Sequence, residues 1–339
     1  MKGINKYIVS FLLWFIITGN LMGQDFHLSQ YDASPLYLNP AMTGMFNGKY
    51  RIHGHYRNQW SSVTTPFTTS SISFDMPYNK LGFGGIILND RAGEGNYNVL
   101  KAVGSLGYCH QLDSAGFHNI SAGLQVGLIH KSINIDKLIF HNQYTYTNSG
   151  GFDPDLPTGE NLANTSLVIP EVTASLLYFY SNSSAKINPF IGFTVFHLTE
   201  PNETFYSNEN NLPRRFVTHL GTKINLSDKI QISPRLLYMI QGNVSEIDLS
   251  FVANYLLVDY DAWVFLGPTY RLFKFNNFTS NDALVMLGGL NYGNFTYQAS
   301  YDINISNLNS ISNGRGGFEL SITYLISNMQ FPPIVCPRL

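Results

Sequence analysis

Charged residues are scarce in this sequence. Asp, Glu, Lys and Arg together make up 12% of its 339 residues, about half of the share found in an ordinary soluble protein. A chain with so little charge cannot cover a large surface with ionised groups, so its composition argues against an ordinary soluble protein. The net charge of −2 also gives no electrostatic basis for binding nucleic acid, and we expect no nucleic-acid partner.

Long hydrophobic runs are also missing. The only substantial apolar stretch runs from Tyr7 to Thr18, and about twelve residues are too few for a transmembrane helix, which needs roughly twenty. Lys2 and Lys6 precede this stretch, and small residues end it before Gln24. The pattern predicts a signal peptide over residues 1–23 and therefore an exported protein. No cysteine lies near the predicted cleavage site, so no lipid anchor is expected there.

Cysteine is nearly absent, and catalytic motifs are missing. Cys109 and Cys336 are the only two cysteines, too few for a structural metal site. They could pair in an oxidising envelope, but their separation does not follow from the sequence. No phosphate-binding loop, dinucleotide fingerprint or HExxH motif occurs. The sequence therefore predicts no catalytic residue, cofactor or metal site, and a protein that is not an enzyme.

Aromatic residues are abundant, at 14%, and they alternate with polar residues. The clearest segment runs from Tyr50 to Trp60. One set of alternate positions holds Tyr50, Ile52, Gly54, Tyr56 and Trp60, and the other holds Arg51, His53, His55, Arg57 and Gln59. A period of two places these sets on opposite faces only if the segment is a β-strand.

Similar alternation recurs along most of the chain and predicts an all-β fold. Fourteen strands are expected, at about 49–60, 66–76, 81–90, 97–110, 119–134, 169–180, 188–197, 215–226, 229–241, 245–257, 262–271, 282–292, 294–303 and 316–326. Low charge, many aromatics and a mean hydropathy near zero are typical of a transmembrane antiparallel β-barrel, in which one side of each strand faces lipid and the other faces the lumen. A soluble all-β domain is the competing interpretation.

The predicted connections alternate in length. Every second one has eight residues or fewer, whereas the others include the long segments 135–168, 198–214, 272–281 and 304–315. Outer-membrane barrels have short periplasmic turns and longer extracellular loops, so the asymmetry favours a barrel over residues 49–326 whose first strand starts at the periplasm. Residues 24–48 are expected at or inside the periplasmic mouth, and residues 327–339 form a predicted periplasmic tail.

Side chains predicted to face the lumen are mostly polar. They include Arg51, Arg57, Gln125, Lys131, Glu246, Asp248, Gln298 and Asp302. A barrel that conducts a hydrophobic solute, such as a FadL-like transporter, needs a continuous apolar path. Transport of a small hydrophobic solute is therefore the second hypothesis and not the first.

Several motifs resemble one known family. The mature N-terminus would read QDFHLSQY, followed by PLYLNPAMTG from Pro35, and later come Arg57-Asn58-Gln59-Trp60 and the stretch PFTT from Pro66. Further similarities are Tyr301-Asp302 and the terminal Cys-Pro-Arg, whereas Phe318-Glu319 departs from the usual His-Glu pair. Together these motifs resemble the PorP/SprF family of the type IX secretion and gliding machinery of Bacteroidota, over nearly the whole mature chain.

The resemblance implies an outer-membrane β-barrel that helps to secrete, anchor or display a cognate surface protein. Its implied partners are a secreted adhesin-like protein or the C-terminal domain of that protein, other periplasmic and outer-membrane type IX components, and the lipid bilayer. No catalytic residue carries over. The expected partner-docking or plug residues are Ser29, Gln30, Tyr31, Asn39, Pro40, Arg57, Gln59, Trp60, Tyr301 and Asp302. Residues 24–48 either form a hydrogen-bonded plug or are turn residues at the barrel mouth, with the mature N-terminus facing the periplasm.

Overall fold

The computed structural model describes residues 25–61, 65–146, 150–276 and 278–326. The predicted signal peptide, the tail 327–339 and Cys336 lie outside these ranges. Within them the chain forms a closed barrel of fourteen antiparallel strands, as the sequence predicts. Its strands are β1 (Tyr50–Gln59), β2 (Phe67–Tyr78), β3 (Leu81–Ala92), β4 (Tyr97–Gln111), β5 (His118–Ser132), β8 (Ser166–Tyr180), β9 (Ile187–Phe196), β10 (Arg215–Asn225), β11 (Ile230–Gln241), β12 (Val244–Leu257), β13 (Ala262–Phe275), β14 (Phe278–Tyr292), β15 (Phe295–Asn304) and β16 (Arg315–Ile326).

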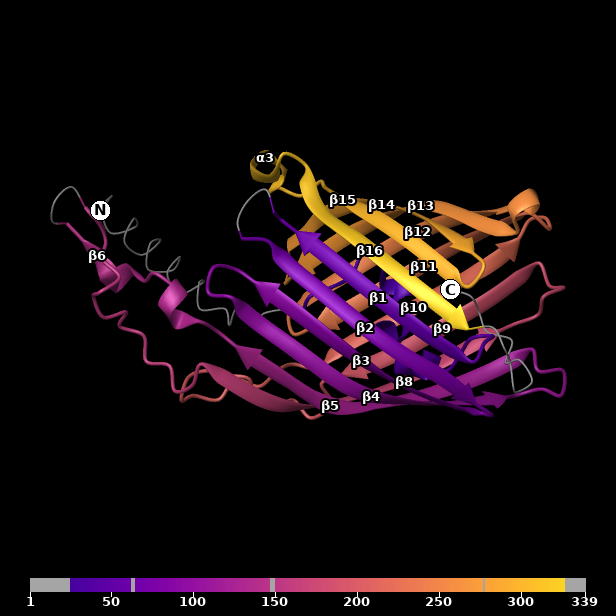
Figure 1. Cartoon of the computed structure of the whole chain (residues 1–339), viewed down its shortest axis with the longest axis horizontal. Helices are drawn as coiled ribbons and strands as arrows, with labels where there is room; N and C mark the ends of the chain where they lie inside the picture. Colours follow the sequence, from indigo (N-terminus) through magenta and orange to yellow (C-terminus); the bar gives the residue numbers. More distant parts are fainter. Residues whose placement is uncertain (1–24, 62–64, 147–149, 277, 327–339) are drawn as a thin grey trace, which may run out of the picture.

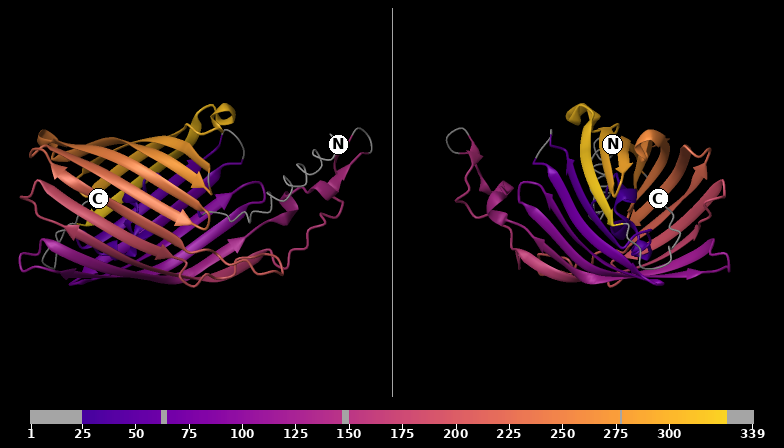
Figure 2. Two further views of the ribbon diagram at one scale, coloured as in Figure 1. Left: turned by 180° about the vertical axis from the view of Figure 1, so that it is seen from behind. Right: turned by 45° about the vertical axis from the view of Figure 1, so that its right-hand side comes forward.

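Neighbours in the barrel are neighbours in sequence, and the sheet closes where the first strand pairs with the last. In that pairing Tyr50 lies opposite Ile326 and Gln59 lies opposite Gly317. Closure leaves no unpaired strand edge, which is what allows a sheet to cross a bilayer. The tilted strands and the closed wall are visible from two sides in Figures 1 and 2.

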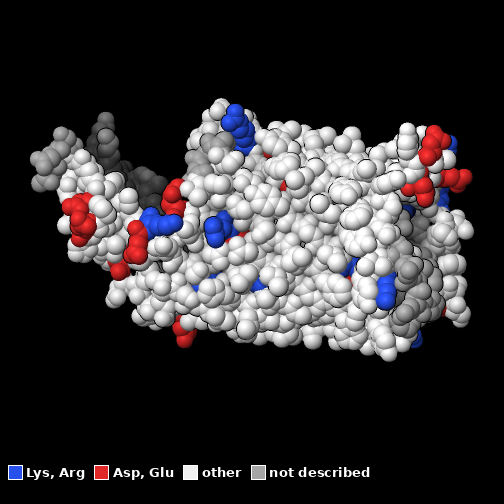
Figure 3. Space-filling view, in the orientation of Figure 1, with Lys and Arg blue, Asp and Glu red and all other residues white. Residues whose placement is uncertain are grey.

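Alternation assigns the two faces of the wall. In β1, Ile52 and Tyr56 are exposed on the outside, whereas Arg51, His55 and Arg57 are buried in the lumen. On the face shown in Figure 3, charged side chains gather toward the two ends, and the middle of the wall is mostly uncharged. An apolar outer surface around a polar interior is typical of a membrane barrel. Among the described residues, no helix is long and apolar enough to cross a membrane.

The connections differ between the two ends of the barrel. At the inner end the longest are residues 112–117 and 181–186, of six residues each, whereas the opposite end carries residues 133–165 and 197–214. By the usual asymmetry of these barrels the short turns are periplasmic and the long connections extracellular. We call residues 133–165 the arm. It contains the two-stranded pair β6 (Tyr144–Thr145) and β7 (Gly151–Phe152) and projects beyond the barrel at the left of Figure 1.

One predicted outer loop is wrong. Residues 272–281 were expected to be a loop, but β13 continues to Phe275 and β14 begins at Phe278, so only two residues separate the strands. The pairing register shifts between Arg271 and Leu272. An irregularity of this kind places an extra residue in one strand and so breaks the period of two, which hides the strand from pattern reasoning.

Residues 25–48, which we call the lumen segment, run inside the barrel. They contain the short helices η1 (Tyr31–Ala33), α2 (Pro35–Leu38) and η2 (Pro40–Met42). The remaining short helices lie in connections, namely η3 (Ile135–Lys137), η4 (His141–Gln143), η6 (Val258–Tyr260) and α3 (Asn309–Ser312). Leu38, Ala41 and Met42 pack with lumen-facing Phe179 and Leu237 in a hydrophobic cluster.

The lumen segment starts near the outer end and descends. Asp25 bonds to Gln241 at the end of β11 and to His197 just after β9, and both positions are at the extracellular end. Gly48 precedes β1 at the periplasmic end. Sequence reasoning put the mature N-terminus at the periplasmic side, and this expectation is wrong. It rested on the position of β1 alone, and the segment is long enough to reach back across the barrel.

Candidate functional site

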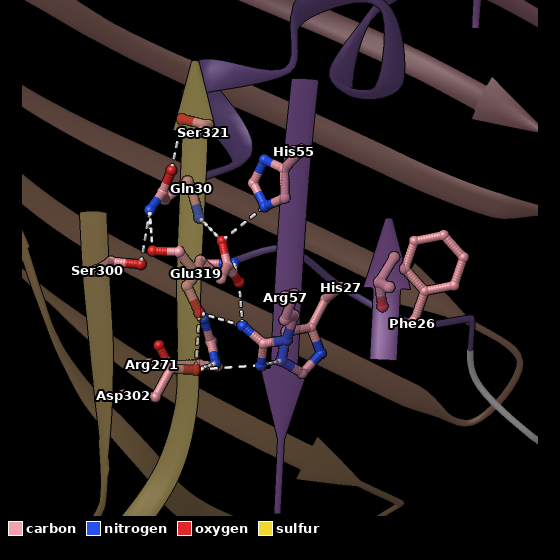
Figure 4. A network of polar contacts seen from close by, with 12 residues as sticks. Phe26, His27, Gln30, His55, Arg57, Arg271, Ser300, Asp302, Glu319 and Ser321 are labelled. Carbon is pink, nitrogen blue, oxygen red and sulfur yellow. Dashed lines mark hydrogen bonds and ion pairs between the residues drawn. The ribbon is translucent and has the colours of Figure 1, made fainter. Parts of the chain in front are cut away.

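A carboxylate on the barrel wall holds the outer part of the lumen segment. Glu319 of β16 accepts hydrogen bonds from the backbone N–H groups of Ser29 at 2.7 Å and Gln30 at 2.8 Å. The Glu319 side chain is fully buried and also lies 3.1 Å from Nε2 of His55. Hydrogen bonds to an ionised carboxylate are about twice as strong as neutral ones, so these contacts fix the chain at Ser29 and Gln30 (Figure 4).

Two buried arginines complete the anchor. Arg57 forms ion pairs with Glu319 and, at 3.1 Å, with Asp302. Arg271 donates to Asp302 at 3.2 Å, and both guanidinium groups donate to the hydroxyl of Ser29. That hydroxyl in turn donates to Asp302 at 2.7 Å. The Ser29 hydroxyl therefore bonds to three charged groups, and its backbone N–H bonds to a fourth, Glu319. We call Ser29, Arg57, Arg271, Asp302 and Glu319 the anchor network.

The side chain of Gln30 is fixed at every polar atom. Its amide nitrogen donates to Ser300 Oγ and to the backbone oxygen of Glu319, both at 3.1 Å. Its amide oxygen accepts from Ser321 at 2.8 Å. Next along the chain, the Tyr31 hydroxyl lies 3.0 Å from Ser250 Oγ.

Asn39 and Pro40 begin the inner part of the segment. Asn39 accepts from the N–H of Ala41 and thereby begins η2, with Pro40 at the first helical position. The amide of Asn39 also donates to the backbone oxygen of Leu176 at 3.2 Å and lies 3.0 Å from His219 Nε2. The Asn39-Pro40 pair thus starts a helical turn and at the same time joins the segment to the wall.

Three glycines let this turn approach the wall. Gly82, Gly107 and Gly123 lie directly opposite one another on β3, β4 and β5. A Cβ at Gly123 would lie 2.1 Å from the Ala41 nitrogen, and one at Gly82 would lie 1.9 Å from the Thr43 oxygen. Any side chain there would collide with backbone, so we call these three residues the glycine row and infer that they are required for the fit.

The predicted site residues occupy four places. Ser29, Gln30, Tyr31, Asn39 and Pro40 lie in the lumen segment, and Arg57 and Asp302 belong to the anchor network. Gln59 and Trp60 line a cavity at the outer end. Tyr301 lies apart from all of these, because alternation turns its side chain to the outer face, where it is 43% exposed.

The sequence also placed Trp60 on the outer face with Tyr56, and this is wrong. β1 ends at Gln59, and Trp60 adopts a positive φ of 59°. The strand period therefore stops one residue earlier than expected, and the indole faces the cavity, 5.5 Å from the ring of Phe67.

Arg271, Glu319 and Ser300 belong to the site, but the pattern analysis did not select them. A signal existed for the two charged residues, because both lie on the polar side of a predicted strand. The missing information is the partner of each charge, since the strands that meet at Ser29 are far apart in sequence. Cys109 of β4 is a free, buried thiol, and the proposed pairing with Cys336 involves a position outside the described residues.

Carboxylates outnumber cations around Arg271. Its guanidinium lies 3.2 to 3.6 Å from four of them: Glu246, Asp248, Asp282 and Asp302. His27 of the lumen segment lies 3.3 Å from Glu246. The outer half of the lumen is thus acidic.

A second polar cluster lies at the outer rim. His197, just after β9, bridges Asp25 of the lumen segment at 2.7 Å and Glu171 of β8 at 2.6 Å. Burial lowers the pKa of His197, but Asp25 and Glu171 outweigh that effect and the net pKa is raised. Burial raises the pKa of Asp25, but His197 and Arg215 outweigh it and hold the pKa far below its usual range. The bridge is therefore an ion pair.

The lumen segment separates outer cavities from an inner one. A cavity of about 560 Å³ and a second of about 340 Å³ lie at the outer end and share the lining residues Asp25, Phe26, Asp90 and Tyr97. A third cavity of about 510 Å³ lies at the inner end, lined by residues such as Arg51, Arg235 and Trp263. It shares no lining residue with the outer two among the described parts of the chain.

Fold and lumen together define an outer-membrane β-barrel whose interior is occupied by its own N-terminal segment. The sequence matches the family described as type IX secretion system membrane protein PorP/SprF over residues 20–324. Because this match covers nearly the whole chain, the protein belongs to the PorP/SprF family.

Solved structures with a similar fold include a hydrocarbon channel and a toluene transporter. The CymD monoaromatic hydrocarbon channel has a TM-score of 0.52 at 12% identity, with 91% of this chain and 95% of CymD covered. The toluene transporter TbuX of Ralstonia pickettii has a TM-score of 0.50 at 10% identity, covering 86% and 93%. At such low identity the similarity extends to the fold alone. No curated protein matches the sequence.

Proposed function

We propose that this protein is a non-enzymatic docking component of type IX secretion that helps to secrete, anchor or display one cognate surface protein. The exported protein, or its C-terminal domain, binds at the extracellular end, in the outer cavities and along the arm. The periplasmic turns and the tail 327–339 contact other components of the secretion machinery. Membership of the PorP/SprF family supports the link to secretion, and the geometry below supports docking at the outer end.

The observation that carries this proposal is the filled lumen. Gln30, Arg57 and Glu319 are all buried at the level of the anchor network, between the outer and the inner cavities. A polypeptide crossing the membrane through this barrel would have to displace a charged network whose disruption costs several kcal/mol. The barrel is therefore better suited to hold a protein at its outer face than to conduct it.

The arm offers a second contact surface at the same end. Its tip carries Tyr144, Tyr146 and Phe152, whose rings meet edge to face at 5.1 Å. Tyr146 is 87% exposed and Phe152 is 55% exposed. Buried Gln143 orders the base of the tip by donating to the backbone oxygens of Pro154 and Leu156. Exposed aromatic clusters on an ordered loop are typical of protein contacts.

The alternative function is transport of a small hydrophobic solute. The fold similarity to hydrocarbon channels and the aromatic residues of the larger outer cavity favour it. However, a solute leaving that cavity toward the periplasm meets Arg57, Arg271 and Glu319, all buried. Desolvating ion pairs of this kind opposes the passage of an apolar molecule.

A deletion strain tests the proposal. Surface proteins are released from intact cells by mild proteolysis and quantified by mass spectrometry in the parent, the deletion and a complemented strain. We expect one or a few exported proteins to disappear from the surface of the deletion strain and to return on complementation. An unchanged set of surface proteins would refute the proposal. Impaired uptake of a hydrophobic solute, with normal surface display, would establish the alternative.

A further inference from the structure

The larger outer cavity has walls of aromatic side chains. It is lined by Phe26, Trp60, Phe67, Tyr97, Phe273 and Phe278, which come from the lumen segment and from the outer ends of β1, β2, β4, β13 and β14. Such walls bind apolar groups, and their ring faces also attract cations. The charged side chains that line the cavity decide whether it favours a cationic, an anionic or a neutral ligand.

Every cation that faces the outer cavities already has an acidic partner. In the smaller cavity, Lys101 pairs with Glu171 at 2.7 Å, Lys131 pairs with Glu203, and Arg215 lies 3.4 Å from Asp25. In the larger cavity, Arg57 pairs with Asp302 and Glu319. These groups are neutralised, and they do not make the site attractive to anions.

Two carboxylates that line the larger cavity are not neutralised in the same way. Asp90 of β3 is only 9% exposed, yet it borders both outer cavities. Thr69 donates to its Oδ1 at 2.6 Å, and no Lys, Arg or His of the described ranges lies within ion-pair distance. Asp282 of β14 shares Arg271 with three other carboxylates. A buried carboxylate without a cation is costly, so a bound cation would be stabilised here.

We propose that the larger outer cavity binds a lysine or arginine side chain that is flanked by an apolar or aromatic residue, with Asp90 as the main ionic partner. Asp282 adds attraction from β14, and Trp60 and Phe67 contact the flanking apolar residue. The assignment of this group to an exported protein rests on the proposed function. A neutral hydrocarbon would leave Asp90 uncompensated, and an anionic ligand would be repelled by it.

Peptide binding to the purified full-length protein in detergent tests the inference. Trp60 and Trp263 are the only tryptophans after residue 23, so in a Trp263→Phe background the emission of Trp60 reports on the cavity. The probe is acetyl-Phe-Lys-Leu-amide. Its comparators are the same peptide with an Nε-acetylated lysine, acetyl-Ala-Lys-Ala-amide, and benzylamine as a small free amine.

We expect the lysine peptide to bind at least about tenfold more tightly than the acetylated peptide, because acetylation removes the charge that Asp90 attracts. D90N should remove this preference, and D282N should reduce it. Glu209→Gln, an equal charge change on an exposed outer loop, should leave it intact. The comparison of the two peptides needs only the Trp263→Phe background, which leaves the lining of the larger outer cavity unchanged, so a folding defect in D90N cannot hide the answer.

Equal affinity for the charged and the acetylated peptide, or binding that D90N leaves unchanged, would overturn the inference. Tighter binding of benzylamine than of the peptide would also overturn it, since the cavity would then serve a small amine. The proposed function is judged separately, by the surface proteins of the deletion strain. Charge-dependent peptide binding together with normal surface display in the deletion strain would support the site and reject the secretion role. Loss of surface proteins without charge-dependent peptide binding would support the secretion role and reject the site.

Discussion

The lumen segment is held at its two ends by different means, mainly charges at the outer end and mainly close packing at the inner end. At the outer end, Ser29 and Gln30 are fixed by hydrogen bonds to buried charges on β1, β13, β15 and β16. At the inner end, residues 40–43 lie against the glycine row, and most of their wall partners are hydroxyls such as Ser105, Ser121 and Ser175. One buried ion pair also contacts this end, because Arg51 donates to the Met42 oxygen and its partner Asp75 accepts from the Gly44 N–H.

This difference separates two physical requirements. Buried ion pairs hold the segment in one orientation, but each charge needs its partner. Removing one charged group leaves its partner buried and uncompensated. Close packing on glycine depends on shape, and the Arg51–Asp75 ion pair is the main charged contact beside it at the inner end. We therefore expect the inner end to be the fixed end, and the outer end, next to the acidic cavity, to be the end that responds to a bound partner.

The largest effect is expected from Arg57→Met. This change removes one of the two guanidinium groups and leaves Glu319 and Asp302 buried with less compensation. Breaking a buried ion pair in this way costs about 3–5 kcal/mol. Urea unfolding in lipid vesicles, followed by tryptophan fluorescence, measures the free energy.

Arg214→Met is the matched control for this experiment. Arg214 pairs with Glu200 at 3.1 Å, but both side chains are nearly half exposed, and such pairs contribute about 0–1 kcal/mol. A loss below about 1 kcal/mol for Arg57→Met as well would mean that the anchor network does not stabilise the fold.

An intermediate effect is expected from Gly123→Ala at the inner end. The new Cβ would lie 2.1 Å from the backbone nitrogen of Ala41, so the segment must shift away from the wall. Overpacking typically costs about 1–3 kcal/mol. We also expect higher ion conductance in planar bilayers, because a displaced segment fills the lumen less completely.

Gly54→Ala provides the comparison, since a Cβ at that position in β1 meets nothing within 4 Å. Its stability and conductance should match the wild type. If Gly123→Ala behaves like Gly54→Ala, the close contact at the glycine row is not needed and the contrast between the two ends disappears.

Much of the barrel was accessible from the sequence because its determinants are local. In β12, Leu249 and Phe251 face out while Asp248 and Ser250 face in, and the period of two shows this without any tertiary information. The prediction failed where the period itself breaks, at the register shift after Arg271 and at the positive φ of Trp60.

The site was less accessible because its contacts are long-range. Ser29 and Glu319 are 290 residues apart in sequence, and no local pattern states that they meet. The glycine row illustrates the same limit. Gly82, Gly107 and Gly123 lie in three predicted strands, but only the pairing register places them side by side.

The smallest effect concerns the rim, where His197 joins the start of the lumen segment to β8. Because its pKa is raised in the folded protein, the stabilisation is complete below the usual histidine value of 6.5 and is lost as the pH rises through the folded value. A neutral imidazole still donates one hydrogen bond, so only part of the bridge disappears. We expect a loss on the order of 1 kcal/mol between pH 6 and pH 9, less than the full worth of two charged hydrogen bonds.

His197→Asn should flatten this pH dependence. Asn tolerates the positive φ of 55° at this position but cannot become cationic. The variant should therefore be less stable than the wild type at pH 6, and its stability should change less toward pH 9. Heat-induced unfolding at both pH values measures the difference, with His141→Asn on the exposed arm as the control. An equally steep pH dependence in His197→Asn would assign the titration to another group and would leave the outer end of the segment held by the anchor network alone.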